Sequence, residues 1–126
     1  AARRTSGAAV TGPYGAAASR SQSAAVTGRS GAAASTVKAG TYTTPRGSTV
    51  TYGKAAAAAA GPSGKRVGGV SGVHVQTAGG QTYSKTSRGA AAVGPRGAAA
   101  KSSSSAAVTG PYGAAGARRS TAAVRR

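Results

Sequence analysis

Short segments rich in Ala, Val, Thr and Tyr alternate along the whole chain with segments of Gly, Pro, Ser and basic residues. Thr, Val and Tyr favour extended backbone, and short apolar runs bounded by turn residues are typical of strands. Ala does not favour strands, so the Ala-rich segments are assigned by their place in the same pattern. The predicted strands lie at 8–11, 16–19, 24–27, 32–35, 41–43, 48–52, 73–76, 81–84, 90–93, 98–100 and 106–109.

A tetrad that ends in Gly recurs between these segments, most often as Gly-Pro-x-Gly or Gly-x-x-Gly. It lies at 12–15, 28–31, 44–47, 61–64, 77–80, 94–97 and 110–113, so its last Gly recurs every 16 or 17 residues. All five prolines of the chain stand at the second position of a tetrad. No change in composition divides the chain, and residues 1–126 are therefore predicted to form a single repeat array.

Each tetrad has the chemistry of a tight turn. Pro fixes φ near −65° at the second position of a type I or II turn, and Gly accepts the positive φ that often follows. A type I turn followed by a left-handed Gly closes a hairpin with a bulge, so each tetrad is predicted to be a hairpin tip. The predicted turn-forming residues are Pro13, Gly15, Gly31, Pro45, Gly47, Pro62, Gly64, Gly80, Pro95, Gly97, Pro111 and Gly113.

Looser polar segments lie midway between the tetrads, and we expect each to be a second connector. They are 20–23, 37–40, 53–54, 68–72, 85–89, 101–105 and 118–121. The chain would then reverse about every eight residues. The predicted fold class is all-β: seven hairpin-like units and part of an eighth, in an antiparallel meander or a β-solenoid with 16–17 residues per unit. The alternatives are helices in the Ala runs, such as 55–60, and disorder favoured by the Gly, Ser and Lys content.

Composition limits both the core and the chemistry. Only eleven residue types occur, with no Leu, Ile, Phe, Met or Trp, so little apolar surface is available to offset the cost of ordering the chain. The chain must remain disordered or stack on copies of itself. No apolar run approaches the ~20 residues of a transmembrane helix, and none is expected.

Side chains that carry common enzyme chemistry are missing from the sequence. Without Asp, Glu or Cys, the chain has no carboxylate pair, no Ser-His-Asp triad and no thiol nucleophile. His74 has no Cys, Asp or Glu to join it in a metal site. We therefore expect no enzyme activity, no metal, no cofactor and no small-molecule substrate.

The unit Ala-Ala-Val-Thr-Gly-Pro-Tyr-Gly-Ala-Ala-Ala-Ser at 8–19 resembles the repeats of Ala/Gly-rich GPYG-type bacterial proteins. That resemblance implies an exported protein. The strand–turn–strand repeat is also similar in kind to bacterial functional amyloids of the curli type, although the chain lacks their Asn and Gln ladders. A thin Ala-rich face would let sheets approach closely, and no unit with the character of a cap stands at either end of the array. The predicted function is a homopolymeric structural filament or surface fibre outside the cell, with copies of the chain as partners.

A net charge of +17 supports an alternative, the binding of a polyanion such as nucleic acid or an acidic polysaccharide, which would place the protein with nucleic acid inside the cell. We expect the basic connectors and tips to form charged columns along both ends of the strands. The candidate polyanion contacts are Arg20, Lys38, Lys54, Lys85, Arg88, Lys101, Arg118 and Arg119, and further basic residues stand at three tips, Arg29, Arg46 and Arg96.

Tyr and Thr are two further candidate binding groups. Tyr rings stack on bases, and the candidates are Tyr14, Tyr42, Tyr52, Tyr83 and Tyr112. A scaffold that binds ice or another ordered surface would need a regular Thr array. Thr11, Thr27 and Thr109 recur at equivalent positions, but we expect the middle units to interrupt the column.

Overall fold

The structure, a computed structural model, describes residues 1–13 and 15–126. Eight strands follow one another in a single sheet, and the described residues contain no helix. The strands are β1 (Ala2–Gly12), β2 (Gly15–Gly28), β3 (Gly31–Thr43), β4 (Thr49–Gly61), β5 (Gly64–Gln76), β6 (Thr82–Gly94), β7 (Gly97–Gly110) and β8 (Gly113–Arg125).

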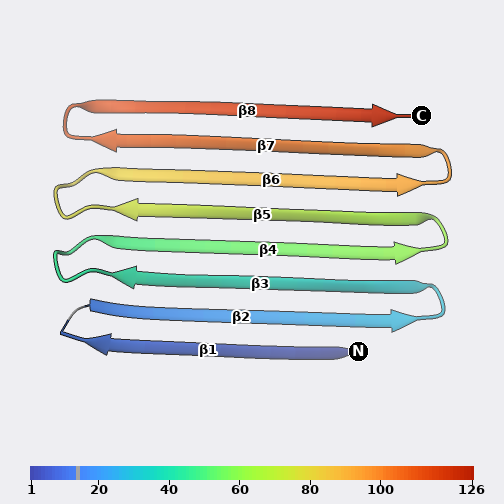
Figure 1. Cartoon of the computed structure of the whole chain (residues 1–126), viewed down its shortest axis with the longest axis horizontal. Helices are drawn as coiled ribbons and strands as arrows, with labels where there is room; N and C mark the ends of the chain where they lie inside the picture. The colour runs from blue at the N-terminus through green and yellow to red at the C-terminus, as the bar shows by residue number, and fades with distance from the viewer. Residues whose placement is uncertain (14) are drawn as a thin grey trace.

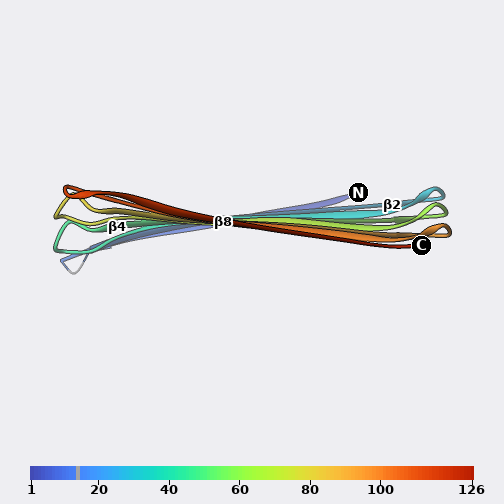
Figure 2. The same ribbon diagram turned by 90° about the horizontal axis from the view of Figure 1, so that it is seen from above.

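Each strand pairs antiparallel with the strands before and after it in sequence, in the order β1 to β8 (Figure 1). The all-β prediction is confirmed, and of its two forms the sheet is the meander rather than the solenoid. In Figure 2 the sheet is a thin single layer whose strands fan out from a common centre, which is the twist expected of paired strands.

The structure corrects the predicted second connectors. Each lies within a strand: 20–23 is the middle of β2, 37–40 lies in β3, and 101–105 is in the middle of β7. The chain therefore reverses once in each unit of 16 or 17 residues, not every eight. The reason is physical: these segments contain no Pro, and a sheet with solvent on both faces accepts Ser, Thr, Gly or Lys at any strand position.

Five of the seven tetrads make tight reversals in which the first and last glycines are direct cross-strand partners. These pairs are Gly12 with Gly15, Gly28 with Gly31, Gly61 with Gly64, Gly94 with Gly97 and Gly110 with Gly113. The last Gly of every tetrad has a positive φ, from 83° to 142°. Tyr14, within the first tetrad, lies outside the described residues.

The two remaining loops, 44–48 and 77–81, are wider. In the first, the N–H of Gly47 donates to the carbonyl of Thr44 at 3.0 Å, and the Thr44 Oγ1 accepts the N–H of Ser48 at 3.1 Å. Gly80 and Thr77 repeat the same arrangement, with the N–H of Gln81 donating to the Thr77 Oγ1. Gly47 and Gly80 have φ of 85° and 83°, which suits the left-handed Gly predicted after a type I turn.

No apolar side chain of the described residues is buried, because the single layer exposes both of its faces. The one residue of the described chain that is buried is Gly40, which lies beneath the ring of Tyr52 on the neighbouring strand. A Cβ at Gly40 would overlap that ring, so a strand Gly here permits the close approach of an aromatic side chain. Backbone hydrogen bonds, rather than a packed core, hold this layer together.

The turn glycines provide a direct test of the register. Gly31→Ala would place a methyl group against the carbonyl oxygen of Ala60 at a φ of 139°, and we expect it to destabilise the sheet by ~1–3 kcal/mol. Gly28→Ala is the matched control, because Gly28 pairs with Gly31 and a Cβ there would meet nothing within 4 Å. Thermal unfolding followed by circular dichroism at one protein concentration measures both. Equal losses of stability would contradict the assigned turn.

Candidate functional site

The register divides the strand side chains between two faces. Direct cross-strand partners share a face, and successive residues of a strand alternate between faces. One face, here called the valine–tyrosine face, carries Tyr42, Val50, Val75 and Tyr83 in a single row across β3 to β6. The other, here called the threonine face, carries Thr43, Thr49 and Thr82, each one position closer to the adjacent turn on the same strands.

Successive turns lie at opposite ends of the strands, so alternate tetrads come together in space. The turns at 28–31, 61–64 and 94–97 share one end, and the other four turns share the opposite end (Figure 1). Six of the 17 basic side chains gather at the first of these ends, around one shallow hollow. This set, here called the cationic end, comprises Arg29, Lys65, Arg66, Arg96, Arg125 and Arg126.

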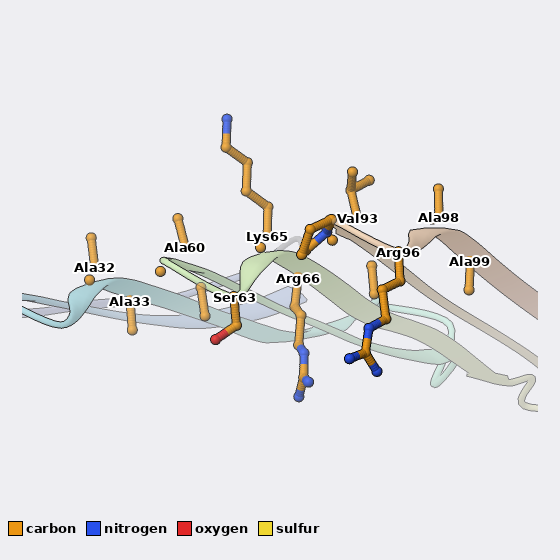
Figure 3. Close-up of a pocket in the computed structure, with 18 of the residues that line it drawn as sticks. Ala32, Ala33, Ala60, Ser63, Lys65, Arg66, Val93, Arg96, Ala98 and Ala99 are labelled. Carbon is orange, nitrogen blue, oxygen red and sulfur yellow. The ribbon is translucent and has the colours of Figure 1, made fainter. Parts of the chain in front are cut away.

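The basic side chains of the cationic end are all exposed and project to both sides of the layer. Figure 3 shows Lys65 on one side with Ala32, Ala60 and Ala98, and Arg66 and Arg96 together on the other. Neighbouring strands lie ~4.8 Å apart, so several of these charges fall within about one Debye length, ~10 Å at 0.1 M salt. The sequence has no Asp or Glu to neutralise them, and the cationic end therefore carries a concentrated positive potential.

The eight candidate polyanion contacts do not form one cluster. They lie in the central parts of their strands and are divided between the faces, with Lys38, Lys54, Lys85 and Arg119 on the valine–tyrosine face and Arg20, Arg88, Lys101 and Arg118 on the threonine face. The expected columns at the strand ends are wrong for these residues, because the presumed connectors continue through the sheet. Lys38 and Lys54 are direct partners on one face, an arrangement that costs stability.

The three basic residues at predicted tips lie at different ends of the strands. Arg29 and Arg96 belong to the cationic end, whereas Arg46 stands in the loop 44–48 at the opposite end. Lys65, Arg66, Arg125 and Arg126 were not among the predicted contacts. Lys65 and Arg66 directly follow a tetrad, which indicates a place near a turn. Their clustering with Arg29 and Arg96 follows from the sequence only if each unit contains a single strand.

The described tyrosines lie away from the basic side chains of the cationic end. Tyr42, Tyr52 and Tyr83 lie on the valine–tyrosine face near the end opposite the cationic end, and Tyr112 is fully exposed in the turn at 110–113, also at that opposite end. Tyr14 lies outside the described residues. Among the described tyrosines, then, none is placed to stack on a base held at the cationic end.

A Thr row forms only in part, and the middle units interrupt it at Gln76 on β5, as expected. One row of the threonine face carries Thr on five of the eight strands: Thr11, Thr43, Thr49, Thr82 and Thr109. Thr27 lies at the other end of β2, beside the turn at 28–31. The row follows the twist of the sheet and includes Ala16, Gln76 and Ala114, so it is not a flat Thr array.

The apolar side chains of larger size concentrate on the valine–tyrosine face. One row across all eight strands contains Val10, Ala17, Tyr42, Val50, Val75, Tyr83, Val108 and Ala115, and the next row on that face contains Ala8, Ser19, Gly40, Tyr52, Val73, Lys85, Ala106 and Ala117. These two rows are here called the valine–tyrosine band. Lys85 is the one basic residue in the band.

Metal chemistry finds no support among the described residues, which contain no group of His, Cys, Asp or Glu side chains able to hold an ion. His74 lies on the threonine face between Thr51 and Ser84. A search of the described residues for a helix that could span a membrane finds none. In comparisons with known proteins, no family model, no curated protein and no solved structure matches the chain.

Proposed function

We propose that this protein is a structural subunit that assembles with copies of itself into an extracellular filament or surface fibre. The observation that carries the proposal is the lack of any buried apolar side chain among the described residues. Ordering a chain costs about 1–2 kcal/mol per residue in backbone entropy, and apolar burial normally offsets that cost. A single layer with both faces in water lacks the stabilisation from apolar burial, and contact with further copies supplies it.

The surface chemistry of the layer supports self-association. Ala, Gly and Ser fill most rows on both faces, and small side chains allow two sheets to approach closely and exclude water between them. The outermost strands, β1 and β8, each present one side of their backbone ladder to a further strand. The regular turn spacing places equivalent side chains of alternate units in the same row, as for Tyr42, Val75 and Val108, so a contact that suits one unit also suits the next unit but one.

Assembly and folding are expected to be coupled. As the concentration of purified chain rises, sedimentation velocity should show growing particles while the β-sheet signal in circular dichroism increases in parallel. Dilution should reduce both together, because the separate layer lacks a core. Electron microscopy of the assembled fraction should show elongated particles. A chain that keeps full β-sheet signal as a monomer at every concentration would contradict the proposal.

A second candidate function, polyanion binding, is favoured by one specific observation, the six basic side chains of the cationic end. A linear polyanion laid across the turns at 28–31, 61–64 and 94–97 would meet basic residues in or directly after each of them. Neutralising six phosphates of a single strand corresponds to a slope of about −4 in log K against log salt. Charge alone carries this binding, because none of the described tyrosines is nearby.

Two adjacent basic pairs make this candidate testable. Lys65→Gln with Arg66→Gln removes two charges from the cationic end, and Arg118→Gln with Arg119→Gln removes two from the middle of β8. With a single-stranded oligonucleotide as probe, the first variant should make the salt slope shallower by about 1.4, and the second should leave it nearly unchanged. Fluorescence anisotropy over a salt series measures the slopes. Equal changes in both variants would show that the net charge, not the cationic end, governs binding.

A further inference from the structure

We infer that the valine–tyrosine band is the contact through which two copies of this chain pack face to face. The inference rests on the self-assembly proposed above and names one of its contacts. Val10 is 68% exposed, and Tyr42 and Val108 are 45% and 46% exposed, although each lies in a row of apolar neighbours. Such a row is the side of an antiparallel sheet that normally covers a core.

The alternation of side chains between the two faces indicates which face is suited to contact with another molecule. In 41–43 and 49–51, the sequences Thr-Tyr-Thr and Thr-Val-Thr place hydroxyls on the threonine face and apolar groups on the valine–tyrosine face. The two faces of this half of the sheet therefore differ strongly in polarity. The threonine face is suited to solvent and the valine–tyrosine face to burial, as in one sheet of a two-layer sandwich.

Charge identifies the partner as a second copy. A chain with a net charge of +17 repels its copies, so contacts between apolar surfaces of two copies are favoured where basic side chains are sparse. The band holds one basic residue, Lys85, among sixteen positions, and the turns beside it add only Arg46 among the described residues. An anionic partner would instead be drawn to the cationic end, which lies at the other end of the strands.

Electrostatics also sets the relative orientation of the two copies. A two-fold axis that runs across the strands through the band sends the two cationic ends in opposite directions. Strands of about 13 residues are ~40 Å long, so these ends would be separated by far more than a Debye length of ~10 Å. The other two-fold arrangement, with its axis along the strands, would superimpose the cationic ends and is disfavoured.

The size of the band matches a modest specific interface. Eight strands at ~4.8 Å and about four residues of strand length give roughly 40 Å by 14 Å per copy. The two copies together would then cover on the order of 1,000 Å², which is the lower bound for a specific protein–protein contact.

A matched pair of double variants tests the contact. Val50→Lys with Val75→Lys changes two direct partners in the band, and Thr51→Lys with His74→Lys changes the next two partners, on the threonine face of the same strands. Both variants add two positive charges. Sedimentation velocity should show the midpoint concentration of assembly raised at least tenfold for the band variant and changed less than twofold for the control.

Different outcomes separate this inference from the broader proposal. Assembly of both variants at the wild-type concentration, or an equal loss in both, would overturn the band as the contact while leaving self-assembly intact. A wild-type chain that stays monomeric would remove the proposed function itself. Circular dichroism of each variant reports whether the sheet still forms.

A second measurement uses the unaltered chain and does not depend on a variant folding. Hydroxyl-radical footprinting labels exposed Tyr rings, and Tyr42, Tyr83 and Tyr112 fall in different tryptic peptides. As concentration rises through assembly, oxidation of Tyr42 and Tyr83 should fall at least threefold. Tyr112, which is 101% exposed and lies outside the band, should show a constant rate. Unchanged oxidation of Tyr42 and Tyr83 in the assembled fraction would overturn the inference.

Discussion

The backbone ladder between neighbouring strands is the interaction on which the rest of this structure depends. The described residues form no packed core that could fix the strands, so the strand register follows from where the chain turns. A glycine with positive φ closes each turn, and in five of the seven turns it pairs directly with the glycine that opens the tetrad. A shift of one residue at any turn would move every side chain of the following strand to the other face.

The register in turn organises the surface. It gathers Val and Tyr on one face and Thr on the other near one end of the strands, and it collects six basic side chains at the opposite end. These regions are scattered in the sequence and become continuous only because alternate turns meet in space. The layer is therefore polarised along its strands, with the valine–tyrosine band toward one end and the cationic end at the other.

The turns are predictable from the sequence because Pro and Gly act locally, and their spacing needs no knowledge of the partner strand. The number of strands per unit could not be obtained in the same way. Segments such as 20–23 and 101–105 have low strand propensity, and their extended form depends on the ladder bonds they make on both sides. Because two strands per unit were predicted, basic residues that lie in the middle of strands were expected at strand ends. The same prediction also hid the cationic end, where Arg29, Lys65, Arg66 and Arg96 meet only if each unit spans the sheet once.

Hydrogen–deuterium exchange of the assembled protein tests the central claim of one continuous strand per unit most directly. The account predicts that amides of 20–23 and 101–105 exchange as slowly as those of the strand residues on either side, because they sit inside paired ladders. The tip amides of Arg29, Ser30 and Arg96 should exchange quickly. Rapid exchange at 20–23 and 101–105, equal to that of the tips, would show that the chain reverses there and would contradict the structure.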